Sequence, residues 1–154
     1  MWLDVLKLLH VLGAAVLFGT GAGIAFFMLI AHRTGDAAAI AHVAGTVVLA
    51  DTIFTATAVI VQPLTGWALA VEAGYGFEDW IAASLALYVL TGACWLPVVW
   101  IQIRMRDLAR AAAASGAPLP PLYRRLFAVW FACGIPAFAA VTAIFALMIF
   151  RPSL

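Results

Sequence analysis

His10 in the first long apolar run of this chain and Asp51 in the second are ionisable side chains that lie well inside these runs. An imidazole in such a run can ligate haem iron or copper, relay a proton, or donate a hydrogen bond to a neighbouring helix. A carboxyl group inside a membrane is costly unless it is protonated, solvated or paired. Asp51 is therefore the residue for which we predict a catalytic role, by proton exchange.

Polar residues continue along one helical face from Asp51, because Thr55, Gln62 and Gly66 follow it at spacings of four, seven and four residues. The third apolar run has a similar face, which comprises Ser84, Tyr88, Thr91, Trp95 and Gln102. Two polar faces in a small helical membrane protein should face each other, and their simplest use is interhelical hydrogen bonding. At the depth of Asp51 the expected partners are Trp95, Gln102 and Arg104.

His10 should lie at the same depth as Gln62 and as Ser84 or Tyr88, because neighbouring helices run in opposite directions. This predicts a layer of convergent polar groups, in which Gln62 and Tyr88 orient whatever binds at His10. Met148 near the end of the fourth run is a possible second soft ligand, or else a residue of the core or the lipid-facing surface.

The elements that position these residues are transmembrane helices. The 154-residue chain is 67% hydrophobic and 10% charged, with a mean hydropathy of +1.13, which excludes a soluble globular domain. Its net charge of +1 gives no attraction to nucleic acid. About 20 apolar residues cross a bilayer as a helix. We predict one all-α domain over residues 1–154, a four-helix transmembrane bundle with helices at about 3–31, 42–71, 79–114 and 123–150.

Basic residues indicate the orientation, because short loops rich in Lys and Arg stay in the cytoplasm. Six arginines lie in or beside the loops after the first and third helices, whereas only Lys7 and Arg151 lie at the other end. Both termini are therefore predicted to lie outside, in a multi-pass protein of the bacterial inner membrane with the lipid bilayer as its partner.

Small residues mark a possible interface on the first helix, at Gly19, Gly21 and Gly23. Such a patch lets another helix or a flat macrocycle approach the backbone closely. It is compatible with a homo-oligomer or with a membrane protein partner. Cys94 and Cys133 lie within apolar runs, and we interpret them as small packing residues.

The opening segment Leu8-Leu9-His10-Val11-Leu12-Gly13 resembles the first helix of a superfamily of four-helix membrane proteins that includes HemJ-type protoporphyrinogen oxidases and CopD-type copper proteins. A closer resemblance covers nearly the whole chain and is to a domain-of-unknown-function family of predicted integral membrane proteins. It rests on Asp51, Gln62-Pro63-Leu64-Thr65-Gly66, Trp95-Leu96-Pro97-Val98, Gln102 and Arg104.

The superfamily resemblance implies a haem site, because His10 matches the first-helix histidine of HemJ-type proteins. Those proteins also use a lysine on the third helix, and the span from Trp80 to Ile103 contains no lysine. That difference argues against porphyrinogen oxidation. The resemblance therefore implies a haem b or redox site around His10 without specifying the reaction.

Our leading functional hypothesis is a haem- or quinone-associated redox protein. In this hypothesis His10 is the metal ligand or proton acceptor, and Asp51 exchanges protons with the cytoplasmic side. The predicted cofactor-binding residues are His10, Gln62, Tyr88, Trp95 and Gln102. Two alternatives stay open. One is a small carrier component for protons, ions or a solute, with a path from His10 to Asp51, and the other is a non-catalytic accessory or scaffold subunit.

Overall fold

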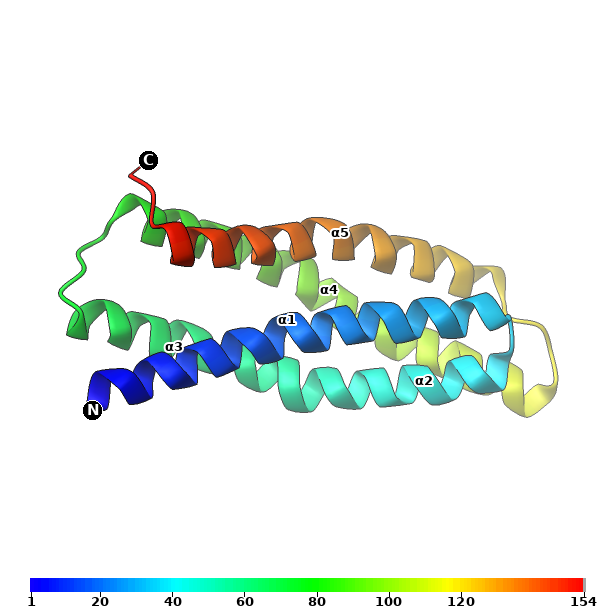
Figure 1. The fold of residues 1–154 in the computed structure, drawn as a ribbon. Coiled ribbons are helices and arrows are strands. Elements are labelled where there is room, and N and C mark those ends of the chain that lie inside the picture. The colour runs from blue at the N-terminus through cyan, green and yellow to red at the C-terminus, as the bar shows by residue number, and fades with distance from the viewer. Residues whose placement is uncertain (154) are drawn as a thin grey trace.

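The computed structural model describes residues 1–153, which form an antiparallel bundle of long helices without a strand (Figure 1). Four helices are long and apolar enough to cross a membrane, which confirms the predicted all-helical membrane fold. The second of them contains a π-helical turn and is therefore divided into three elements. The elements are α1 (Trp2–Thr34), α2 (Ala37–Ala50), the π-helix η1 (Asp51–Thr55), α3 (Ala56–Glu72), α4 (Asp79–Ser115) and α5 (Pro121–Phe150).

The two ends of the bundle differ in what they contain. Both chain termini and the loop between α3 and α4 lie at one end, which we call the terminal end (Figure 1). The α1–α2 and α4–α5 loops lie at the other end, together with the six arginines described above, and we call it the basic end.

The second membrane helix begins at Ala37, five residues before the predicted start at His42, and α1 continues three residues beyond the predicted end at Ala31. The cause is a very short turn. Gly35 has a left-handed backbone with a φ of 67° and ends α1. The Asp36 side chain then accepts a hydrogen bond from the Ala38 backbone nitrogen at 2.8 Å and caps α2.

A packed apolar core fills the basic-end half of the bundle. Its largest completely buried side chains are Met28, Ile40, Met105 and Tyr123. We call this set of residues the basic-end core, and it comprises Ile24, Met28, Ala31, Ile40, Ala41, Ala44, Val47, Ile101, Met105, Ala109, Tyr123, Phe127 and Trp130. All four membrane helices contribute to it, so this half fixes their relative positions.

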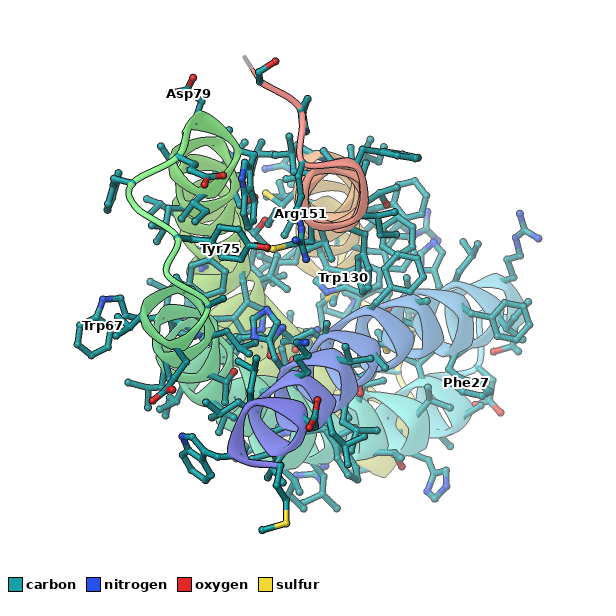
Figure 2. The ribbon with its side chains drawn as sticks, turned by 60° about the vertical axis from the view of Figure 1, so that its left-hand side comes forward. Phe27, Trp67, Tyr75, Asp79, Trp130 and Arg151 are labelled. Carbon is teal, nitrogen blue, oxygen red and sulfur yellow. The ribbon has the colours of Figure 1, made fainter. Side chains whose placement is uncertain are left out.

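The terminal-end half contains fewer buried residues, and they form no comparable cluster. They are Leu6, Ala58, Thr65, Trp80, Ser84 and Ala140. Here Arg151 lies over the rings of Tyr75 and Trp80, with its guanidinium carbon 5.2 and 5.6 Å from their centroids (Figure 2). Arg151 also donates a hydrogen bond to the Tyr75 hydroxyl, which ties the end of the chain to the α3–α4 loop.

Large apolar side chains point away from the bundle over much of its surface. Trp67 is 74% exposed and Phe27 is 60% exposed, and both project outward (Figure 2). Such a surface would be unfavourable in water over so large an area. Such a surface is favourable in a lipid bilayer, because lipid tails contact apolar side chains without a cost in free energy.

Candidate functional site

The Asp51 carboxyl group lies inside the bundle and is 4% exposed. It is the first residue of the π-helical turn. The indole nitrogen of Trp95, on α4, donates to both carboxyl oxygens at 3.1 and 3.2 Å. The prediction that Trp95 is a partner of Asp51 is therefore confirmed.

Gln102 extends this contact to α5. We assign its amide orientation from its neighbours, because only one orientation satisfies both: the nitrogen then donates to Oδ2 of Asp51 at 3.1 Å, and the oxygen accepts from Nε1 of Trp130 at 3.1 Å. Asp51, Trp95, Gln102 and Trp130 thus form one hydrogen-bonded set, which we call the Asp51 network. The fourth member was missed by the sequence analysis, although a buried indole usually needs an acceptor and could have signalled it.

The Asp51 network contains no cation. Arg104, the third partner predicted from sequence, is exposed, and among residues 1–153 no basic group forms an ion pair with Asp51. The Thr55 hydroxyl, four residues along, is buried without a hydrogen-bond partner within the described chain. All the groups that are hydrogen-bonded to the carboxyl group are therefore neutral N–H donors. The nearby Thr55 hydroxyl is able both to donate and to accept a hydrogen bond.

The π-helical turn is a local feature that the spacing of the sequence did not reveal. The Ala56 backbone nitrogen donates to the Asp51 carbonyl five residues earlier, instead of to the residue four earlier. Such turns are rare, and they occur frequently at functional sites. This one holds Asp51 and Thr55 together on the buried side of the helix.

His10 makes its contact on the terminal side of the Asp51 network. Its Nδ1 lies 2.9 Å from the Thr65 hydroxyl. That hydroxyl donates its proton to the Val61 carbonyl at 2.9 Å, with the Gln62 carbonyl at 3.1 Å as the other acceptor. In the tautomer that suits this arrangement the hydroxyl accepts from a protonated Nδ1 of His10, which leaves the lone pair of Nε2 available.

Two glycines let α1 and α3 approach closely around His10. The imidazole lies against Gly66, where an added Cβ would stand 3.0 Å from its Cε1 atom. Conversely, Gln62 lies against Gly13, where an added Cβ would stand 2.5 Å from the amide oxygen. Each helix therefore accommodates a polar side chain of the other at a glycine.

The predicted layer of Gln62, Ser84 and Tyr88 around His10 does not form as expected. Ser84 donates to the Trp80 carbonyl of its own helix at 2.7 Å. Tyr88 donates to the Val59 carbonyl. Pro63 has no N–H and leaves that carbonyl without its usual helical donor, so the Tyr88 hydroxyl replaces it. Thr65, not considered as a partner, takes the contact with His10.

A row of polar groups nevertheless lies between the two sites along the second membrane helix, although the Thr55 hydroxyl and the Gln62 side-chain oxygen have no hydrogen-bond partner within the described chain. We call it the polar seam, and it consists of Asp51, Thr55, Tyr88 at the Val59 carbonyl, Gln62, and Thr65 with His10. Successive positions lie about 4.5–6 Å apart along the axis, given a rise of 1.5 Å per residue. The predicted polar face is therefore present, and the Tyr88 hydroxyl at Val59 lies between Thr55 and Gln62 along it.

The other candidate ligands are dispersed. Among residues 1–153, no group of three or more His, Cys, Asp or Glu side chains can hold a metal ion. Cys94 and Cys133 are reduced and partly buried. His32 stacks on Phe127 with ring centroids 3.6 Å apart, whereas His42 is exposed.

The glycine patch on the first helix has no partner within the chain. An added Cβ at Gly19 or Gly21 would meet no atom within 4 Å, and one at Gly23 would meet only Phe27, at 3.9 Å. Within the described bundle, therefore, no other helix packs closely against the backbone at this glycine patch.

Comparison with known proteins identifies a family. A model of a family described as "Predicted integral membrane protein (DUF2269)" matches residues 4–152. No curated protein and no solved structure matches the chain. Because the match covers almost the whole length, the chain belongs to the DUF2269 family of predicted integral membrane proteins, whose function is unknown.

Proposed function

We propose that this membrane protein takes up and releases protons at Asp51. The observation that carries the proposal is a carboxyl group, 4% exposed, whose partners Trp95 and Gln102 are neutral. A negative charge buried without a cation is costly. Binding a proton removes the charge, while the N–H donors and Thr55 keep the ionised form accessible.

The polar seam supplies a path between Asp51 and His10. Each of its positions has a hydroxyl, amide or imidazole group. Steps of about 4.5–6 Å along the axis exceed a direct hydrogen bond, so the proposal requires a bridging water at each gap. In this proposal the basic end faces the cytoplasm, as the positive-inside rule predicts. Asp51 then exchanges protons with that side.

Proton flux into liposomes tests the proposal. The purified protein is reconstituted with a pH-sensitive dye inside, and a potassium diffusion potential drives proton entry. Asp51→Asn keeps the size of the side chain and removes the titrating group, so we expect flux to fall to that of empty liposomes. Asp107→Asn, at the half-exposed residue that pairs with Arg106, is the control and should keep the flux. Equal flux in Asp51→Asn and the wild type would refute the path.

A second candidate function, a redox protein with haem b or a quinone at His10, is favoured by the His10–Thr65 contact. Ligating histidines usually donate through one ring nitrogen to a second-shell acceptor, which orients the other toward the metal. Thr65 provides that acceptor for Nδ1, so Nε2 of His10 is suited to haem iron or to a quinone oxygen. A bound haem would supply one-electron chemistry, while Asp51 holds the exchanged proton.

An optical spectrum separates this candidate from the first. Protein from haem-replete cells is compared, oxidised and reduced, with His10→Ala and with His42→Ala as a matched exposed control. A Soret band lost only in His10→Ala would support haem ligation at His10. A colourless wild-type protein would exclude the haem version and leave proton exchange at Asp51 as a separate question.

A further inference from the structure

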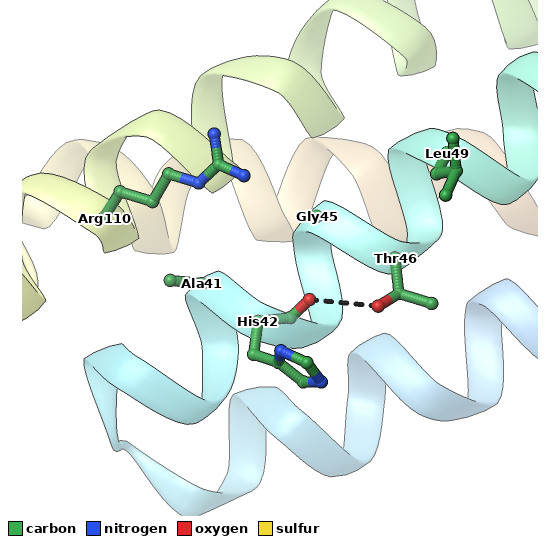
Figure 3. Close-up of a pocket in the computed structure, with 6 residues that line it drawn as sticks. All are labelled: Ala41, His42, Gly45, Thr46, Leu49 and Arg110. Atoms are coloured by element: carbon green, nitrogen blue, oxygen red, sulfur yellow. Dashed lines mark hydrogen bonds between the residues drawn. The ribbon is translucent and has the colours of Figure 1, made fainter.

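A pocket of about 440 Å³ lies between α2 and α4 near the basic end (Figure 3). Arg110 extends from α4 toward Gly45 of α2, and His42 and Thr46 lie on the neighbouring turns (Figure 3). Leu49 lies one turn deeper along α2, toward the middle of the bundle. The pocket is thus polar at one end and apolar at the other, and it is separate from both the Asp51 network and His10.

Arg110 is an unpaired cation. Among residues 1–153 it forms no ion pair, and the neighbouring Asp107 is engaged by Arg106 at 2.9 Å. Gly45 lies close to the Arg110 guanidinium, since an added Cβ would stand 3.4 Å from one of its nitrogens, at ordinary contact distance. The charge therefore lies against the α2 backbone with its remaining N–H donors open to a ligand.

The depth of the pocket fits the boundary between headgroups and acyl chains. A helix of 36 residues is about 54 Å long and a hydrocarbon core is about 30 Å thick, so roughly 12 Å projects at each end. His42 and Arg110 each lie five residues from a helix end, at headgroup depth. Leu49 lies deeper and is 59% exposed, as a residue facing an acyl chain would be.

From this arrangement we infer that the pocket binds an anionic phospholipid of the leaflet at the basic end. The headgroup phosphate contacts the Arg110 guanidinium, and an acyl chain runs along Leu49. Thr46 donates its own proton to the His42 carbonyl at 3.2 Å, so its oxygen can accept from a headgroup hydroxyl. Phosphatidylglycerol supplies both the phosphate and the hydroxyl, whereas a soluble anion would leave the apolar part of the pocket unused.

Native mass spectrometry of the full-length protein tests this inference, with phosphatidylglycerol and phosphatidylcholine added at equal concentration. Arg110→Gln removes the charge, and Gly45→Leu fills the space without changing charge. A single basic residue near a membrane surface accounts for roughly a fivefold preference for anionic lipid. We expect Arg110→Gln to lose about that much retained phosphatidylglycerol, and Gly45→Leu to lose retention because the space is filled. Arg125→Gln, at an exposed arginine of α5 outside the pocket, should lose less than Arg110→Gln.

Three results would overturn the inference. The first is equal retention in Arg110→Gln and Arg125→Gln, and the second is equal retention of the two lipids by the wild type. The third is displacement of phosphatidylglycerol by inorganic phosphate, which would make the pocket a site for a soluble anion. Circular dichroism checks that Gly45→Leu is folded. If it is not, the comparison of the two arginine variants decides the question alone.

Discussion

The two halves of the bundle are held together in different ways. In the basic-end half, side chains from all four membrane helices form a core in which Met28, Met105 and Tyr123 are completely buried. In the terminal-end half, α1 and α3 meet through Gly13 and Gly66.

The Asp51 network lies at the border of the packed half, because Trp130 belongs both to it and to the basic-end core. His10 lies in the less packed half. The difference indicates a rigid carboxyl site and a more adaptable imidazole site, since tightly packed side chains have few alternative positions.

The largest effect should come from truncation in the packed half. Met105→Ala removes a completely buried side chain and should lower the free energy of unfolding by about 2 kcal/mol or more. Met148→Ala makes the same chemical change in the terminal-end half, at a partly exposed residue, and should cost less than about 1 kcal/mol. Denaturant-induced unfolding in detergent measures the free energy of unfolding of both variants. Equal losses would mean that the two halves are packed alike.

The next effect concerns the glycine contact of the terminal-end half. Gly66→Ala places a Cβ 3.0 Å from the His10 ring and should destabilise the fold by about 1–3 kcal/mol. Gly21→Ala is the matched control, because its Cβ meets no atom within 4 Å, and alanine favours helix. It should be neutral or stabilising in the same unfolding measurement. Destabilisation by both variants alike would contradict the proposed contact.

A smaller effect is expected at Tyr88. Tyr88→Phe removes the donor to the Val59 carbonyl and should cost about 1 kcal/mol. Pro63→Ala restores a backbone N–H four residues after Val59, so Tyr88→Phe should cost less in that background. A double-mutant cycle measures the coupling between Tyr88 and Pro63, and we expect about 0.5 kcal/mol or more. Strict additivity would show that Tyr88 does not replace the missing helical donor.

The sequence predicted correctly those side-chain contacts that depend only on two residues lying at the same depth in the membrane. The four helices follow from apolar length, and Trp95 and Gln102 were expected beside Asp51 because all three lie at one level. The start of the second helix was placed at His42, because an apolar run does not show that Gly35 and Asp36 suffice for the turn.

Other features depended on geometry that residue spacing does not encode. The π-helical turn at Asp51 is one shifted backbone hydrogen bond. Thr65 lies one helical turn from Gln62, and only the rotation of α3 against α1 decides which of them meets His10. Trp130 was missed because it lies in a run of apolar residues with no polar periodicity.

The most direct test of proton exchange at Asp51 is infrared difference spectroscopy of the reconstituted protein during a pH titration. Proton exchange at Asp51 predicts a carbonyl stretching band from a protonated carboxyl group that appears and disappears with pH in the wild type, and that is absent from Asp51→Asn. A band of constant intensity over the whole range, or one that persists in Asp51→Asn, would contradict it, because Asp51 would then not be the group that exchanges the proton.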